Sequence, residues 1–145
     1  AASPACPRLS LSLNAAREEL RRELMPVTQK HSLKRLREVL QALSRRERER
    51  ISLEYVLLGG VNDSEHDAVD VARFAKGLKV KVNLIPFNPA EGLPFVPSEP
   101  ARVLAFQDAL IGAGIMTSVR KSRGPDILAA CGQLARKNWG MEASP

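Results

Sequence analysis

The sequence predicts an α/β fold in which parallel strands alternate with crossover helices as part of a (β/α) barrel. Apolar residues recur with a period that switches repeatedly between two and three to four residues, which is the rhythm of βαβ units. The predicted strands also carry polar residues on one face, whereas parallel strands covered by helices on both faces are apolar throughout. Polar faces on successive strands favour a barrel lumen. The alternative is an open sheet whose faces are only partly covered.

The first half of the chain predicts a strand and two helices. In RLSLSLN, leucines alternate with polar residues over 8–14, which is typical of a strand. A short helix over about 16–25 ends before Pro26, because the residue before a proline disfavours helical geometry. Ser32 can cap a second helix, whose apolar residues recur at helical spacing: Leu33, Leu36, Leu40 and Leu43. The basic run at 45–50 is expected to be a solvated helix end and loop.

The second half continues the alternation. ISLEYVLLGG at 51–60 predicts a strand closed by two glycines, and a strand over about 79–85 leads into a proline-containing loop. Between them lies a helix capped by one of three polar residues, Asn62, Asp63 or Ser64, with an apolar stripe of Ala68, Val71, Ala72, Ala75 and Leu78. Ser98 is expected to cap a helix with Pro100 in its first turn and a buried side of Val103, Phe106 and Leu110. A short last strand is expected over about 115–120.

Composition narrows the class of protein. There is no GxGxxG or GxxxxGK[ST] motif, so neither a dinucleotide site nor a P-loop is predicted. Two cysteines far apart, Cys6 and Cys131, indicate reduced thiols in a cytoplasmic protein, or in an organelle if the source is eukaryotic. The formal net charge of +6 favours a polyanionic partner, nucleic acid first. One basic cluster, at 120–123, directly precedes the segment that contains Cys131.

The polar strand faces and the strand ends predict where a ligand binds. The polar faces consist of Ser10, Ser12 and Asn14, of Ser52 and Glu54, and of Lys81 and Asn83. A buried Glu54 needs a partner, for which Lys81 or Asn83 is a candidate. In barrels the chemistry lies at the carboxyl ends of the strands. Here those ends supply amides and the Gly59-Gly60 backbone, which a ligand can approach closely. We therefore expect a small polar ligand with a phosphate-bearing partner above it.

Four stretches, taken together and in this order, resemble a known family: LSLNAAREELRRELMPV, ISLEYVLLGGVNDS, KVNLIPFNP and RKSRGPDILAACGQL. They are similar to the C-terminal half of the radical SAM adenine-C2 RNA methyltransferases of the RlmN/Cfr type. The resemblance implies a partial (β/α) barrel of the radical SAM type, with a 4Fe-4S cluster that cleaves S-adenosylmethionine into a radical. It also implies that a second S-adenosylmethionine methylates a cysteine. The methyl carbon then passes to carbon 2 of an adenine in large-subunit rRNA and, for RlmN-like members, in tRNA.

The same resemblance assigns roles to residues. Cys131 matches the methyl-carrying catalytic cysteine, and the structural alternative is a buried small hydrophobic residue. The residues that match S-adenosylmethionine contacts are Ser12, Leu13, Asn14 and Asn88, for which turn formation is the alternative at both asparagines. The cations expected to hold RNA phosphate or to lower the pKa of the cysteine are Arg120, Lys121 and Arg123. The barrel portion is then about 8–120, and the cysteine loop and tail are 121–145.

The chain also departs from the family pattern. It contains no CxxxCxxC motif, so no metal ligand is assigned here, and the cluster is expected to be held by a missing N-terminal half. Cys6 matches no family motif, and Pro125 stands where the family has an acidic residue. The full enzyme would need an electron donor such as flavodoxin. One alternative is a chain without chemistry, either a basic RNA-binding module or an inactive remnant. Another alternative is an unrelated barrel enzyme that acts on a phosphorylated metabolite.

Overall fold

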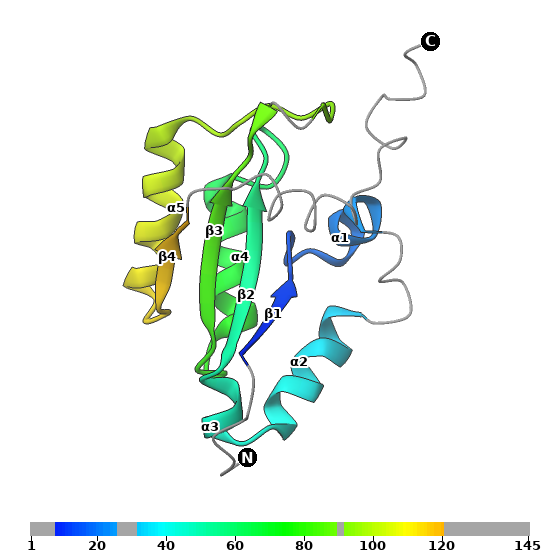
Figure 1. The fold of residues 1–145 in the computed structure, drawn as a ribbon, viewed down its shortest axis with the longest axis vertical. Helices are drawn as coiled ribbons and strands as arrows, with labels where there is room; N and C mark the ends of the chain where they lie inside the picture. Colours follow the sequence, from blue (N-terminus) through cyan, green and yellow to red (C-terminus); the bar gives the residue numbers. More distant parts are fainter. Residues whose placement is uncertain (1–7, 26–31, 90–91, 121–145) are drawn as a thin grey trace.

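The computed structural model describes residues 8–25, 32–89 and 92–120, and these form a four-stranded parallel sheet with helices between the strands (Figure 1). The elements in chain order are β1 (Leu9–Ser12), α1 (Glu18–Leu24), α2 (Leu33–Ala42), α3 (Arg45–Arg48), β2 (Ile51–Leu57), α4 (Glu65–Ala75), β3 (Lys81–Pro86), α5 (Pro100–Gly112) and β4 (Thr117–Val119). The predicted α/β fold with parallel strands and crossover helices is confirmed.

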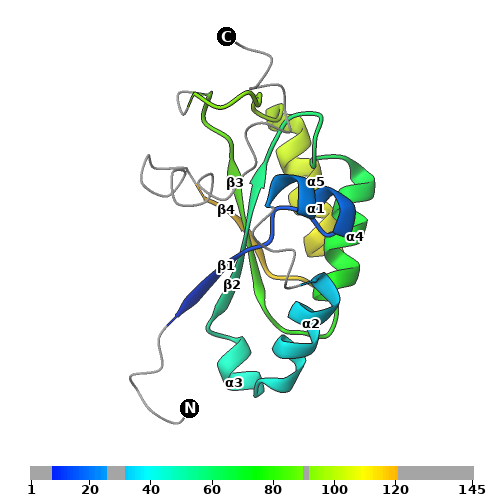
Figure 2. The same ribbon diagram turned by 90° about the vertical axis from the view of Figure 1, so that its right-hand side faces the viewer.

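The order of the strands explains why, within the part of the chain that the structure describes, one face of the sheet has no helix on it. The strands are arranged β1-β2-β3-β4, so each crossover moves one place in the same direction. Since crossovers between parallel strands are right-handed, α1, α2, α4 and α5 all lie on one side of the sheet, as Figure 2 shows. A doubly wound sheet would reverse its strand order and carry helices on both faces. The observed arrangement is that of consecutive strands in a barrel wall.

The predicted helix starts are confirmed at two places and wrong at a third. The Ser32 side chain caps α2 by accepting a hydrogen bond from the backbone NH of Arg35, and Ser64 caps α4 in a capping box with Asp67. At α5 the N-cap residue is Glu99, not Ser98. The Ser98 hydroxyl instead donates to Asp63 at 2.7 Å. This bond attaches the segment before α5 to the loop after β2.

The basic run predicted as a helix end and loop contains a short helix of its own, α3. Ser44 and Glu47 form a capping box at its start. Arg48 donates to the carbonyl groups of Leu40 and Gln41 at the end of α2, and the Leu40 carbonyl also accepts from the NH of Leu43. The cations of this run therefore do not share one role, since Arg48 is used in joining α2 to α3.

Two apolar clusters hold the described residues together. The larger lies between the sheet and the helices and includes Leu53 and Tyr55 of β2, together with Phe106 of α5. The smaller lies toward the carboxyl ends of the strands and joins α1 to residues of β2, β3 and the segment after β3, including Val56 and Ile85. Every helix in the ranges that the structure describes is too short or too polar to cross a bilayer.

Candidate functional site

A row of four polar residues crosses the helix-free face of the sheet. Strand pairing places Ser12 beside Glu54, Glu54 beside Asn83, and Asn83 beside Ser118. Residues paired in register on parallel strands point to the same face. With neighbouring strands about 4.8 Å apart, the row spans about 14 Å. We call Ser12, Glu54, Asn83 and Ser118 the polar row. The prediction that polar side chains of successive strands share one face is confirmed, and Ser118 extends that face to β4.

Glu54 is buried in this row and is neutralised by a residue that the sequence did not indicate. Only 7% of the residue is exposed, and its Oε1 lies 3.0 Å from Nη2 of Arg120. The predicted partners were Lys81 or Asn83. This prediction is wrong, because Lys81 pairs in register with Ser52, and Asn83 accepts a hydrogen bond from the Ser118 hydroxyl. Arg120 follows β4 directly and reaches Glu54 across β3.

The carboxyl ends of β1 and β2 are fixed by two buried asparagines, Asn14 and Asn62. Asn14 is fully buried with φ of 56°, and its Oδ1 accepts a hydrogen bond from the backbone NH of Val56 at 2.9 Å. The Nδ2 of Asn62 donates to the carbonyl groups of Asn14 and Val56, and its Oδ1 accepts from the NH of Leu58. We call these two residues the asparagine clamp. The amide groups at both strand ends are thus held by side chains rather than by strand pairing.

Arg21 of α1 holds the strand end beside Ser12. Its Nε donates to the carbonyl oxygen of Leu13 at 3.1 Å, and its Nη2 donates to that of Ser12 at 3.2 Å. The residue is only 5% exposed, and burial lowers the pKa of its guanidinium, an effect that Glu18 partly opposes. A guanidinium held in this way fixes the orientation of the last peptide groups of β1.

Of the two glycines after β2, Gly59 leaves no room for a ligand, contrary to the prediction, whereas the space beside Gly60 is open. A methyl group added at Gly59 would lie 2.7 Å from the carbonyl oxygen of Pro97 and 2.9 Å from Val96. The NH of Gly59 donates to the carbonyl oxygen of Val96 at 2.7 Å. Gly60 has φ of 74° and forms the turn that follows. The close approach that requires a glycine is therefore made by the segment before α5.

The remaining predicted site residues fall partly outside the described ranges. Asn88 lies in the loop after β3, is partly exposed, and stands at the same edge of the sheet as the asparagine clamp. Arg120 is described, through its ion pair with Glu54. The predictions for Cys131, Lys121 and Arg123 lie outside the residues that the structure describes.

The polar groups suit S-adenosylmethionine but not an iron–sulfur cluster. Oε2 of Glu54 is buried and has no hydrogen-bond partner among the described residues, so an acceptor is available in the polar row. Hydroxyl and amide groups of the row complement the amino, carboxylate and hydroxyl groups of S-adenosylmethionine. A cluster needs at least three cysteines, and the whole chain has two. Across the described ranges no group of three potential metal ligands was found.

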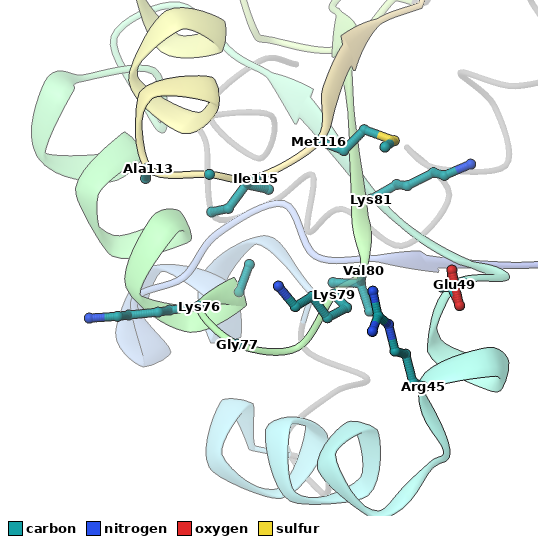
Figure 3. A pocket seen from close by; sticks show the side chains of 12 residues that line it. Arg45, Glu49, Lys76, Gly77, Lys79, Val80, Lys81, Ala113, Ile115 and Met116 are labelled. Carbon is teal, nitrogen blue, oxygen red and sulfur yellow. The ribbon is translucent and has the colours of Figure 1, made fainter.

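Two adjoining cavities lie at the opposite, amino ends of the strands. The larger, about 600 Å³, is bounded by the turns before β3 and β4 and by α3 (Figure 3). The smaller, about 250 Å³, shares Glu49 and Lys81 with it. We call the charged residues that line the two cavities the basic end: Arg8, Arg45, Arg46, Arg50, Lys76, Lys79, Lys81 and Glu49.

Comparisons with known proteins find relatives that match most of this chain. No family model matches the chain. The chain is 54% identical over 130 residues to a probable dual-specificity RNA methyltransferase RlmN of Koribacter versatilis, covering 90% of this chain and 38% of that protein. It is 48% identical over 128 residues to a dual-specificity RNA methyltransferase RlmN of Anaeromyxobacter, covering 88% of this chain and 34% of that protein.

A solved structure agrees with these relatives. The crystal structure of a radical SAM methyltransferase from Sphaerobacter thermophilus superposes with a TM-score of 0.75 at 38% identity, covering 92% of this chain and 39% of that one. The chain thus spans about a third of the length of the proteins it matches. About half of the residues are identical over nine tenths of this chain, so the chain matches one part of an RlmN protein.

Proposed function

We propose that this chain is the carboxyl-terminal part of an RNA methyltransferase of the radical SAM class. Its substrate is carbon 2 of an adenine in large-subunit rRNA, and tRNA is a second substrate. The observation that carries the proposal is the 54% identity to an RlmN relative over 130 residues. That match spans nine tenths of the chain. The geometry agrees with the proposal, since polar residues of paired strands face one side of the sheet and Ser12 among them stands at the carboxyl end of β1.

The cofactor site that we propose is the polar row together with the strand ends beside it. S-adenosylmethionine, when bound, supplies the methyl group. In this proposal the Ser12 hydroxyl and the Asn88 amide, which belong to two partly exposed residues, form hydrogen bonds with the cofactor. Leu13 and Asn14 are buried, so their part in cofactor binding is to fix the strand end that presents Ser12. Arg21 supports the same strand end through its two carbonyl contacts.

The group that receives the methyl carbon is, in this proposal, the thiolate of Cys131. A thiolate is the reactive form of cysteine, and cations close to it raise the thiolate fraction at neutral pH. Lys121 and Arg123 are ten and eight residues before Cys131 in the sequence and serve either this role or contact with RNA phosphate. The 4Fe-4S ligands and the contact with an electron donor such as flavodoxin belong to other parts of the full enzyme, since this chain has too few cysteines.

A hybrid protein tests the proposal. The chain replaces the matching 130 residues of the Koribacter versatilis relative, in a bacterial host that lacks its own enzyme. Mass spectrometry of rRNA nucleosides should then find 2-methyladenosine, and the Cys131→Ala hybrid should produce none. The unaltered relative is the control. A soluble, iron-loaded hybrid that leaves the rRNA unmethylated, in a host where the relative methylates it, would contradict the proposed function.

A basic RNA-binding module without chemistry is the second candidate, favoured by the two-cysteine count and by the basic end. This candidate predicts RNA affinity that falls steeply with salt and does not depend on Cys131. The hybrid experiment distinguishes this candidate from the methyltransferase, because a module without chemistry produces no methylated adenine even when the rest of the enzyme is present.

A further inference from the structure

The basic end is strongly positive. Seven cationic side chains and one carboxylate line the two cavities, a local excess of six. Within the part of the chain that the structure describes, the amino ends of the strands therefore carry a localised positive surface.

Three cations of the basic end are available to a partner. Arg45, Lys79 and Lys81 are exposed, and none of them takes part in an ion pair with any residue that the structure describes. Figure 3 shows Arg45 rising from α3 toward the start of β3, while Lys76 points away on the other side of the cavity. The charges therefore spread along the rim of the cavity instead of converging on one point.

The backbone at Lys79 indicates that a cation is retained there at some cost. Lys79 has φ of 61°, in the left-handed region that favours glycine or asparagine. The turn is required, because Leu78 and Val80 on either side of it are both buried. The fold thus needs left-handed geometry at this position, and because a lysine rather than a glycine occupies it, the turn presents an exposed cation at the edge of the cavity.

We propose that the basic end is a docking surface for the phosphate backbone of folded RNA, at the opposite edge of the sheet from the strand ends of the proposed cofactor site. The choice of RNA as the partner rests on the proposed function. Several exposed, unpaired cations spread along a rim suit a polymer of phosphates, because each neutralised phosphate releases a counterion and adds to the affinity. A single phosphate would require a compact group of converging donors, and the charges here are spread over seven side chains.

Two variants of equal charge test the proposal on the 145-residue chain. The first replaces three cations of the basic end: Arg45→Gln, Lys79→Gln and Lys81→Gln. The matched control replaces three exposed cations that line neither cavity: Arg22→Gln, Lys34→Gln and Arg102→Gln. Fluorescence anisotropy with a labelled RNA hairpin gives Kd over a series of salt concentrations, and circular dichroism checks that each variant is folded.

The basic-end variant should bind the hairpin at least about tenfold more weakly at low salt. Its plot of log K against log salt should flatten by about 2 units, since each lost phosphate contact removes about 0.7 to 0.9. The control should stay within about twofold of the unaltered chain. Equal losses in the two variants, or no binding of the hairpin by the unaltered chain, would overturn the proposal.

Competing ligands separate RNA from other anions. Inorganic phosphate at constant ionic strength should displace the hairpin only at high concentration, and phosphatidylserine vesicles should bind no better than phosphatidylcholine vesicles. Displacement by micromolar phosphate would mean that the partner is a small anion and not RNA. Vesicle binding that is lost in the basic-end variant would mean that the partner is a lipid surface.

The hybrid experiment and the RNA-binding experiment can fail separately. Methylation by the hybrid protein together with unchanged RNA affinity of the basic-end variant would remove this inference alone. Loss of methylation with the RNA result intact would remove only the proposed function.

Discussion

Removing the Asn62 side chain should cost a large part of the stability of this fold. The side chain is fully buried and makes three hydrogen bonds of 2.8 to 2.9 Å, to the carbonyl groups of Asn14 and Val56 and to the NH of Leu58. The Asn62→Ala variant leaves all three backbone groups buried without that partner. At roughly 1 to 1.5 kcal/mol for each, the free energy of unfolding should fall by about 3 to 5 kcal/mol. A domain has about 5 to 15 kcal/mol in total.

Urea denaturation followed by circular dichroism measures this loss, with m values compared to check that unfolding stays two-state. The matched control is Asn83→Ala, because Asn83 is only half-buried and its side chain has one hydrogen bond, from Ser118. That variant should lose no more than about 1 kcal/mol.

An Asn62→Asp variant separates hydrogen bonding from packing. Aspartate fills nearly the same space and can still accept from the NH of Leu58, but it places an oxygen against the carbonyl groups that the amide contacted. It should be at least as destabilised as the alanine variant. A stable Asn62→Asp protein, or an Asn62→Ala loss no larger than that of Asn83→Ala, would refute the idea that the asparagine clamp fixes the strand ends.

Three further changes test other parts of the structure. Gly59→Ala places a methyl group 2.7 Å from a backbone oxygen and should destabilise the fold by about 1 to 3 kcal/mol, whereas Gly112→Ala, in open space, should not lower the melting temperature. Burial raises the pKa of Tyr55 well above 10, so above pH 10 the unfolded state releases a proton that the folded state keeps. Stability should then fall by up to about 1.4 kcal/mol per pH unit, and the tyrosinate absorbance of this single tyrosine should stay flat until the protein unfolds. A double-mutant cycle of Glu54→Gln and Arg120→Gln should give a coupling of about 1 to 2 kcal/mol, because one partner is buried and the other is 41% exposed; zero coupling would contradict the ion pair.

The sequence predicted the fold well because periodicity depends on local residues. Alternation along β1, β2 and β3 located one polar face, and strand pairing aligned three of its residues, Ser12, Glu54 and Asn83. Ser118 could have been added, since Met116, Ser118 and Arg120 alternate in the same way in the predicted last strand. What alternation does not give is register, which decides which polar residue stands beside which.

The errors of the sequence analysis concern partners that lie far apart in the chain. Arg120 neutralises Glu54 from two strands away, so no local pattern connects the two residues. At Gly59 the sequence indicates a close approach but not what makes it, and the approaching group is the backbone at Val96 and Pro97. Asn62 was considered only as a helix cap, because its hydrogen bonds to Asn14 and Val56 depend on how β1 and β2 end in space.

The length of β3 separates most of the basic end from the strand ends of the proposed cofactor site. From Lys81 to Pro86 the strand runs for five residue steps, which is roughly 17 Å, although Lys81 itself lies only two residues before Asn83 of the polar row. The Debye length at physiological ionic strength is about 8 Å, so the two ends of β3 are about two screening lengths apart. Screening over that distance leaves roughly a seventh of the potential of an exposed cation at the strand ends. A variant that keeps Lys81, Arg45→Gln with Lys79→Gln, should therefore weaken RNA binding while changing the affinity for S-adenosylmethionine by less than about twofold, which isothermal titration of the hybrid protein can measure. A parallel loss of both affinities would mean that the two ends are coupled through the fold rather than through charge.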